Sequence, residues 1–432
     1  MDKIDDLLLK LEQLPKGYIS KKNIYGKEYF YLQYKDGNKL VSKYISSKDL
    51  DELKKQLEER NRIEQELKGL FAKEKNLNSL SPKTLSLSGY IMSGDKTVAT
   101  FDKGNLVSID EKLAPLIVKR THDLVAFLSS RVLDTSRTNA RILKRILNIH
   151  GEDDYLIALK NHATSVTDNY WFRSVNSRLK YKDVCLESDI YNEISLEGDI
   201  SVYPKQPKLS PQFSLLGSFE KCWKIHNNQW WMYKKGSKEE LLSEYISANL
   251  SHALGIPTAE YELIDEYIRS KNFADKYNFE PVASLFGDND SFEYVFDGLY
   301  KLDQKLAEQY LYIIWFDALT NNVDRHNENL GVLRDKQTGE IVSLSPNYDL
   351  NMTLFARNKT LNKERDGFIN LFLKFVNNNE TVKNIYKSLK CPCLDDKIIN
   401  ELLSKIDLSD YSFDLSGYLL YRYEMLKTVF NL

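Results

Sequence analysis

The sequence predicts an α+β fold, with strands gathered in one part of the chain and helices in another. Strand-like segments dominate from Leu215 to about Phe273, and helix-like segments dominate from Lys305 onward. Such segregation along a chain is typical of the α+β class. The chain has 432 residues, 42% hydrophobic and 28% charged, which is an ordinary globular composition. This length predicts roughly two to four folded units.

Changes in composition divide the chain into four predicted units. Residues 1–80 combine a basic hairpin with a charged helix, and residues 76–82 have the composition of a linker. Residues 83–205 are expected to be a mainly helical unit. Residues 206–300 hold the strand-rich part and residues 301–432 the helical part, and these two units carry the residues that suggest chemistry.

Composition argues against several classes of protein. A net charge of −2 argues against nucleic-acid binding by the whole surface, although a local basic patch is compatible with it. The four cysteines are scattered, as in proteins of a reducing compartment. Cys391 and Cys393 form a C-x-C pair with no second ligand pair at zinc spacing. No signal peptide and no window of 18 apolar residues is found, so we expect a cytoplasmic protein without a membrane partner.

Residues 16–45 form a local exception to this balance of charge. The segment contains seven lysines and two acidic residues, Glu28 and Asp36, so its net charge is +5. Six tyrosines are interleaved with the lysines. Basic charge combined with aromatic rings is typical of nucleic-acid surfaces. The alternative is a small sheet with a solvated lysine face.

The strongest indication of chemistry follows an apolar helix predicted over residues 310–320. A polar loop follows it, in which Asp324 and Asn329 lie five positions apart with His326 between them. This is the spacing of the aspartate and asparagine in a kinase catalytic loop. Asp324 would accept the proton of an attacking hydroxyl, and the amide of Asn329 would reach Mg²⁺. His326 is expected to orient Asp324 or the loop backbone.

Asp349 supplies a third group of the kind that this chemistry needs. It follows a short predicted strand and a turn that contains Pro346. An ionised carboxylate in this position would hold Mg²⁺ against the phosphates of a nucleotide. Leu350 and Asn351 replace the Phe-Gly that usually follows this aspartate in eukaryotic protein kinases, so that class is a poor match.

The strand-rich part offers groups for the phosphates. Residues 213–223 read as a strand-turn-strand whose Gly217 would let backbone N–H groups cradle a phosphate. Lys234 and Lys235 end the next predicted strand, and Glu244 lies on the helix after it. Because neighbouring strand residues face opposite sides, only one of the two lysines can serve, and Lys234 is preferred.

These segments resemble the motifs of the HipA-like serine/threonine kinases. Residues 214–221 are similar to their phosphate loop, residues 322–329 to their catalytic loop and residues 346–349 to their metal motif. The resemblance implies a two-lobed kinase-like fold, with 206–300 as the N-lobe and 301–432 as the C-lobe. It also implies phosphate-loop, nucleotide and metal roles for a set of residues. These are Gly217, Ser218, Phe219, Lys221, Lys234 and Glu244 for ATP, Asn329 and Asp349 for Mg²⁺, and Ser214 or Ser218 for autophosphorylation.

The resemblance further implies an ATP- and Mg²⁺-dependent kinase that acts on protein serine or threonine. Many members of the family are toxins paired with an antitoxin. The sequence departs from the family pattern at Ser218 and Phe219, where Ala-Gln is usual, and in its first 200 residues. Two alternatives stay open: a phosphotransferase for a small molecule or lipid head group, and a catalytically silent module that binds nucleic acid or a partner.

Overall fold

The computed structural model describes residues 14–15, 17–24, 27–36, 39–46, 48–60, 62–63, 87–147, 149, 154–199, 207–357, 360–361 and 367–431. The chain forms two compact units, Met1–Thr84 and Leu85–Leu432. The linker expected over residues 76–82 lies outside the described residues. The finer boundaries near residues 206 and 301 stay predictions.

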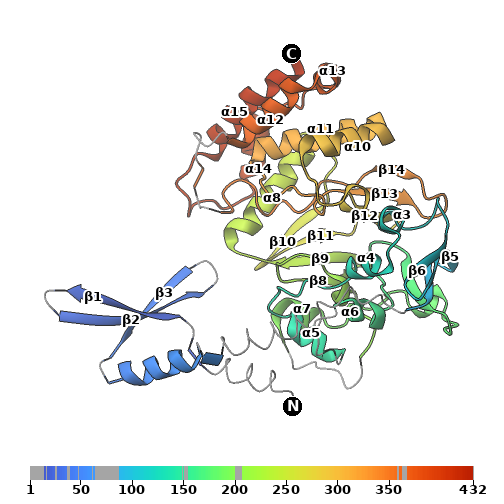
Figure 1. The fold of residues 1–432 in the computed structure, drawn as a ribbon. Helices are drawn as coiled ribbons and strands as arrows, with labels where there is room; N and C mark the ends of the chain where they lie inside the picture. The colour runs from blue at the N-terminus through green and yellow to red at the C-terminus, as the bar shows by residue number, and fades with distance from the viewer. Residues whose placement is uncertain are drawn as a thin grey trace. The chain divides into compact units, whose positions relative to one another are not determined.

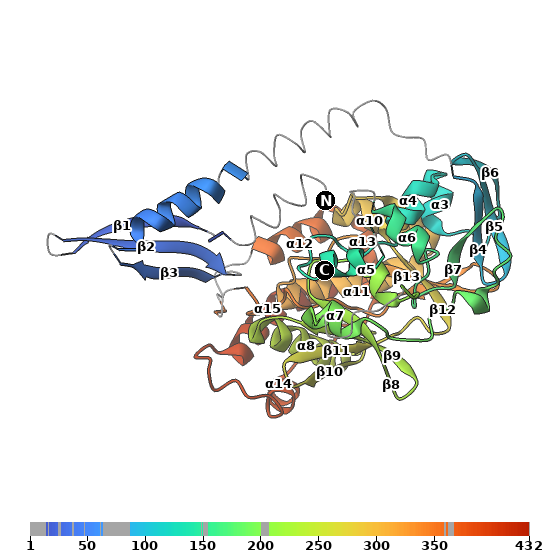
Figure 2. The same cartoon turned by 90° about the horizontal axis from the view of Figure 1, so that it is seen from below.

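The first unit contains a three-stranded antiparallel sheet in the order β1-β2-β3. Its strands are β1 (Tyr18–Ile24), β2 (Lys27–Asp36) and β3 (Lys39–Ile45). Pairing of Asp36 with Lys39 joins β2 and β3 in the predicted hairpin. A helix follows over residues 50–60 and runs beside the sheet (Figures 1 and 2).

The second unit begins with a mixture of strands and short helices. A four-stranded sheet in the order β6-β5-β4-β7 comprises β4 (Gly89–Ser93), β5 (Lys96–Asp102), β6 (Asn105–Ile109) and β7 (Tyr170–Ser174). The helices are α3 (Leu116–Thr121), α4 (Leu124–Ser129), α5 (Ala140–Ile146), α6 (Tyr155–Lys160), η1 (Tyr181–Asp183) and α7 (Asn192–Glu197). The mainly helical segment expected here therefore also holds a sheet, whose apolar strand residues pack into one core with the helices.

A second four-stranded sheet, in the order β10-β11-β9-β8, and one long helix follow. The strands are β8 (Lys221–His226), β9 (Gln229–Lys235), β10 (Tyr261–Ile264) and β11 (Tyr267–Lys271), and the helix is α8 (Lys238–Ala253). Ser237 and Glu240 form a capping box that starts α8. The strand predicted before Gly217 is wrong, because Pro211–Ser214 is a 3-10 helix, η3, capped by the side chain of Ser210.

The rest of the second unit is mainly helical. A three-stranded sheet in the order β12-β13-β14 comprises β12 (Tyr277–Pro281), β13 (Gly331–Asp335) and β14 (Ile341–Leu344). The helices are α9 (Ala283–Phe286), α10 (Phe292–Leu302), α11 (Gln304–Thr320), α12 (Gly367–Asn378), α13 (Glu380–Ser388), α14 (Asp396–Leu403), α15 (Leu415–Leu426) and η4 (Lys427–Asn431). The predicted α+β class is confirmed, and within this unit the helices α11, α12, α13 and α15 gather away from the sheet of β8–β11 (Figure 1).

Helix α11 anchors the helical part of this unit. Asp303 caps its first turn, and Asn321 in the left-handed conformation ends it. Most of the helix is buried in a large apolar core that also includes α10, α12, α13 and α15. Among the described residues, no helix combines the length and apolar character needed to cross a lipid bilayer.

Candidate active site

A cavity of about 870 Å³ in the second unit gathers nearly all the predicted site residues. The predicted residues that line it are Ser214, Gly217, Ser218, Phe219, Lys221, Lys234, Asp324, His326, Asn329 and Asp349. Glu244 is fully buried behind this wall and contacts Lys234. The predicted segments are called below the phosphate loop (residues 214–221), the catalytic loop (residues 322–329) and the metal loop (residues 346–349).

The catalytic loop is held in a tight turn by its own polar groups. The Asn322 side chain donates to Asp317 Oδ1 at 2.8 Å and accepts from the backbone N–H of Asp324 at 3.3 Å. The Asn329 amide nitrogen donates to the carbonyl of Asp324 at 3.1 Å. These bonds fix Asp324 and Asn329 relative to each other, so that both line the cavity.

Arg325 joins the catalytic loop to the metal loop. Its guanidinium is buried and donates to both oxygens of Asp317, at 2.8 and 2.9 Å. The same group donates to Asn347 Oδ1 at 2.7 Å and to the carbonyl of Asn329. Burial opposes the charge on Arg325, but the carboxylate of Asp317 raises its pKa. A bidentate pair of this kind combines charge with fixed geometry.

Lys234 connects the strand-rich part to the metal loop. Its ammonium lies 2.8 Å from Glu244 Oε1 and 2.7 Å from Asp349 Oδ1. Burial alone would lower the pKa of Lys234, but the charges of Asp349 and Glu244 raise it well above its usual value. Burial likewise opposes ionisation of Asp349, and Lys234 and Lys221 outweigh it, so the pKa of Asp349 is lowered. Lys235 instead pairs with Glu197, at 2.6 Å.

The backbone of Asp349 is strained. Its φ of 58° lies in the left-handed region, which non-glycine residues rarely adopt. The Asp349 N–H donates to the hydroxyl of Tyr261 at 3.0 Å, and the next N–H, of Leu350, approaches Glu244 Oε1 at 3.4 Å. Strain of this kind persists only where the surroundings enforce it, and it is concentrated at functional sites.

Lys221 is a cation without a carboxylate partner among the described residues that line the cavity. Burial lowers the pKa of its ammonium to about 8, and the charge of Asp349 opposes this shift. A Cβ added to Gly217, whose φ is +89°, would lie 2.6 Å from Lys221 Nζ. Gly217 therefore permits both the turn and the close approach of the Lys221 ammonium. This ammonium gives the cavity a positive charge that is suited to binding an anion.

The preceding segment of the second unit supports the phosphate loop at both ends. The N–H groups of Leu133 and Asp134 donate to the carbonyls of Phe213 and Leu215, each at 2.9 Å. At the other end, Arg137 Nη2 donates to the carbonyl of Lys221 at 2.7 Å. The hydroxyl of Ser195 donates to the same carbonyl at 2.7 Å. Between these anchors, the described residues Leu216, Gly217 and Ser218 are exposed.

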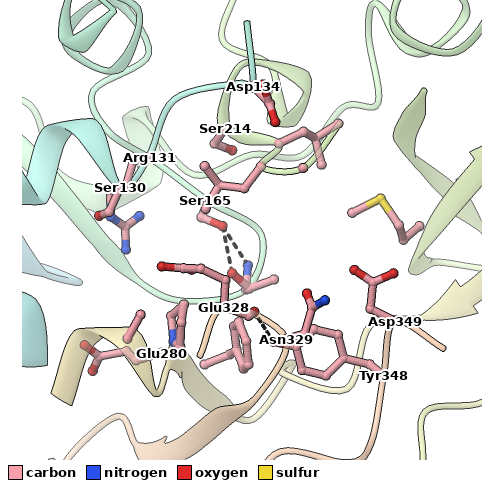
Figure 3. Close-up of a pocket in the computed structure, with 18 of the residues that line it drawn as sticks. Ser130, Arg131, Asp134, Ser165, Ser214, Glu280, Glu328, Asn329, Tyr348 and Asp349 are labelled. Carbon is pink, nitrogen blue, oxygen red and sulfur yellow. Dashed lines mark hydrogen bonds between the residues drawn. The ribbon is translucent and has the colours of Figure 1, made fainter. Parts of the chain in front are cut away.

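The other predicted residues have clear positions. His326 Nδ1 accepts from the N–H of Glu328 at 3.2 Å, so the ring contacts the loop backbone. Ser214 is half-buried at the end of η3, with its hydroxyl bonded to the carbonyl of Pro211 at 3.1 Å. Figure 3 shows Asn329 and Asp349 directed into the cavity from one side, with Ser214 and Asp134 on the opposite side.

Several residues that line the cavity or support its loops were not singled out from the sequence as site residues. The sequence gives one indication of a role for Asp317, because this residue is charged and lies inside an otherwise apolar helix. It gives no such indication for Arg137, Ser195 and Tyr261, because these residues contact the loops only when distant segments of the chain meet. The segment before the strand-rich part also lines the cavity, through residues that include Phe127 and Arg131.

The second unit is an α+β structure whose cavity gathers the residues predicted from three separate loops. Residues 201–407 match the family model of the HipA-like C-terminal domain, the family that the sequence motifs resemble. Residues 2–55 match the model of a domain of unknown function, DUF6788. No curated protein sequence matches the chain.

Two solved structures are similar over different shares of the chain. One is the Helicobacter pylori proinflammatory kinase CtkA, with 18% identity, a TM-score of 0.36 and coverage of 48% of this chain and 89% of that one. The other is from the Shewanella oneidensis MR-1 toxin–antitoxin system HipA, HipB and operator DNA complex, with 15% identity and a TM-score of 0.46. It covers 79% of this chain and 96% of that one. The likeness to the HipA-like family rests on the match over residues 201–407.

Proposed function

We propose that the chain is an ATP- and Mg²⁺-dependent protein serine/threonine kinase of the HipA-like type. One observation carries the proposal: Lys234 and Asp349, 115 positions apart, meet at 2.7 Å in the cavity that Asp324 and Asn329 also line. A strand lysine, a helix glutamate and two loop carboxylates around one cavity are the parts that phosphoryl transfer from ATP requires.

Lys234 and Lys221 are the groups proposed for the phosphates of ATP. Glu244 holds Lys234 from behind, so the ammonium stays in the cavity when it exchanges Asp349 for a phosphate oxygen. Lys221 forms no ion pair with a carboxylate among the described residues, so no such pair has to break when a phosphate binds. The exposed residues Gly217 and Ser218 belong to the same loop, and Gly217 lies close to the Lys221 ammonium. Phe219 also lines the cavity as part of this loop.

Asp349 and Asn329 are the proposed Mg²⁺ ligands. Among the described residues, no three His, Cys, Asp or Glu side chains converge on a single metal position. This donor set still fits Mg²⁺, which is commonly held by one or two carboxylates together with substrate phosphates. The ion would neutralise charge on the transferred phosphoryl group.

Asp324 is the proposed catalytic base, with His326 as a loop-positioning residue. The serine or threonine oxygen of the substrate forms a bond to the γ-phosphorus while the bond from that phosphorus to ADP breaks. The hydroxyl proton passes to the carboxylate of Asp324. Ser214 and Ser218 line the same cavity and are the proposed positions of autophosphorylation. We also propose a cytoplasmic location and an antitoxin partner, on the strength of the family match alone.

The test is incubation of the full chain with γ-labelled ATP and Mg²⁺, alone and with a cell lysate. We expect acid-stable label on serine or threonine in protein, and a fall of about 10²–10⁴-fold in its rate for Asp324→Asn. Thermal unfolding should be nearly unchanged in this variant, because only proton acceptance is lost. Label confined to small molecules or lipid would favour the alternative phosphotransferase, and an unchanged rate in the variant would refute the assignment of Asp324.

A further inference from the structure

The backbone that follows Asp349 is held in place against α8. Leu350 is fully buried, and its carbonyl accepts hydrogen bonds from the N–H of Thr353 at 3.3 Å and from the Thr353 hydroxyl at 2.7 Å. The same hydroxyl lies 3.2 Å from the carbonyl of Ser243 and 2.8 Å from the hydroxyl of Ser247, both on α8. These contacts fix the stretch between Asp349 and Thr353.

Asn351 lies inside this fixed stretch and lines the cavity. It is only 4% exposed, yet its Oδ1 atom accepts no hydrogen bond from any described residue. A buried acceptor without a donor is costly, because the oxygen has lost its hydrogen bonds to water. The fixed backbone on both sides keeps Asn351 at the cavity wall in spite of this cost.

Asn351 differs in its position from the other described residues that have a buried, unsatisfied side-chain atom. None of those other residues lines the cavity. An unsatisfied atom inside the packed interior has no access to a ligand, whereas one in a cavity wall can be satisfied by what the cavity binds. Unsatisfied buried polar atoms are rare enough in folded proteins that each one requires an explanation. The position of Asn351 indicates a donor that belongs to the ligand.

The neighbours of Asn351 indicate the chemistry of this donor. Asn351 lies two positions after Asp349, which together with Asn329 is a proposed Mg²⁺ ligand. Asn329 and Asp349 are directed into the cavity from one side (Figure 3). Mg²⁺ sites in proteins usually retain several water molecules, and groups beyond the direct ligands orient the metal shell through hydrogen bonds. A fixed carbonyl oxygen, which can only accept a hydrogen bond, suits a metal-bound water.

We propose that Asn351 is a positioning residue whose side-chain oxygen accepts a hydrogen bond from a water molecule in the Mg²⁺ shell. The proposal rests on the proposed kinase function, because it needs the nucleotide and its ion. Asp349 and Asn329 would hold the ion directly, and Asn351 would orient its hydration from the same wall. The competing explanation is a water molecule that bonds to Asn351 without regard to Mg²⁺.

The experiment measures ADP binding to the full chain by isothermal titration calorimetry, over a series of Mg²⁺ concentrations and with a chelator in place of Mg²⁺. We expect Asn351→Leu to raise the Mg²⁺ concentration needed for half of the maximal ADP affinity by about tenfold, a typical effect of losing a group that supports a metal shell. Asn351→Ala, which removes the oxygen without adding bulk, should give the same shift. Asn351→Asp keeps an acceptor and should need no more Mg²⁺ than the wild type. ADP affinity without Mg²⁺ should be equal in all four proteins.

Unfolding in urea without nucleotide supplies a second measurement. Asn351→Leu should be at least as stable as the wild type, because the change removes a buried oxygen that has no donor. Asn161→Leu is the matched control, since Asn161 is 2% exposed and its side chain both donates to the carbonyl of Ser210 and accepts from the N–H of Ser210, each at 3.0 Å. This variant should be less stable than the wild type, with the Mg²⁺ dependence of ADP binding unchanged.

The Mg²⁺ dependence of ADP binding separates this proposal from the proposed kinase function. Wild-type Mg²⁺ dependence in both Asn351→Leu and Asn351→Ala would overturn the role of Asn351 and leave the kinase function standing. Loss of stability in Asn351→Leu to the extent seen in Asn161→Leu, again without a change in Mg²⁺ dependence, would identify Asn351 as a purely structural residue. If Mg²⁺ does not increase the ADP affinity of the wild type, the kinase function and the role of Asn351 both fail.

Discussion

The two sides of the cavity are held in different ways. The catalytic and metal loops are joined by Arg325, whose bonding partners all lie within 23 positions of it in the chain. The phosphate loop is anchored by Arg137, which lies 84 positions before its partner Lys221, and by Ser195, which lies 26 positions before it. One side is therefore built within the helical part, and the other depends on a segment outside the predicted kinase lobes.

Under the proposed function, this difference predicts that nucleotide binding and phosphoryl transfer can be impaired separately. Disturbing Arg325 should affect the groups proposed for proton transfer and Mg²⁺. Disturbing Arg137 or Ser195 should affect the loop proposed for the phosphates. Asp349 touches both sides, because it belongs to the metal loop and pairs with Lys234.

The largest effect is expected from Asp349→Asn. The change removes the proposed metal carboxylate and also the charge that Lys234 faces, so both sides of the cavity are altered. We expect labelling from ATP to fall by about 10²-fold or more and half-saturation to require more Mg²⁺. Asp335→Asn is the control, because Asp335 is an acidic turn residue that is not among the residues lining the cavity. Equal Mg²⁺ dependence in the two variants would contradict the role of Asp349.

Arg325→Met should lower both stability and turnover. The change leaves the Asp317 carboxylate buried without its cationic partner, which typically lowers the free energy of unfolding by about 3–5 kcal/mol. Turnover per folded molecule should fall because the two loops lose their shared anchor. Arg334→Met tests the specificity of this effect, since Arg334 and Glu280 form another buried pair, 2.6 Å apart, between β13 and β12. Denaturant unfolding should show similar losses of stability, with turnover per folded molecule reduced mainly in Arg325→Met.

The pH dependence of kcat/KM for MgATP should reflect the protonation of Lys221. Its folded-state pKa is lowered to about 8, so the ammonium is charged below that pH and neutral above it. We expect kcat/KM for MgATP to fall as the pH rises through about 8, because kcat/KM follows the free enzyme. Lys221→Arg should remove this fall, since arginine stays charged. A wild-type profile that is flat between pH 7 and 9 would argue against Lys221 as a group that binds the phosphates.

The sequence predicted the catalytic side better than the phosphate-loop side. Asp324 and Asn329 lie on one short loop, so their spacing alone indicated that they act together. The pairing of Lys234 with Glu244 followed from a strand and the next helix. By contrast, η3 replaces the strand expected before Gly217, because Ser210 caps a helical turn and the carbonyls of Phe213 and Leu215 bond to Leu133 and Asp134. Local sequence patterns do not predict hydrogen bonds to partners so far away in the chain.

The smallest effect is expected from Ser195→Ala, and it is the sharpest test of the two-sided arrangement. The Lys221 carbonyl would lose one of its two donors and keep Arg137, a change worth about 1 kcal/mol. If the anchor sets the position of the phosphate loop, KM for MgATP should rise by about two- to fivefold while kcat changes little, because the catalytic loop has its own support. Ser93→Ala is the control, since Ser93 also makes a part-buried hydrogen bond, to Asn169 at 3.0 Å, on the sheet of β4 and β7. A fall in kcat with KM unchanged would mean that the two sides of the cavity are coupled, and the separation drawn here between binding and chemistry would be wrong.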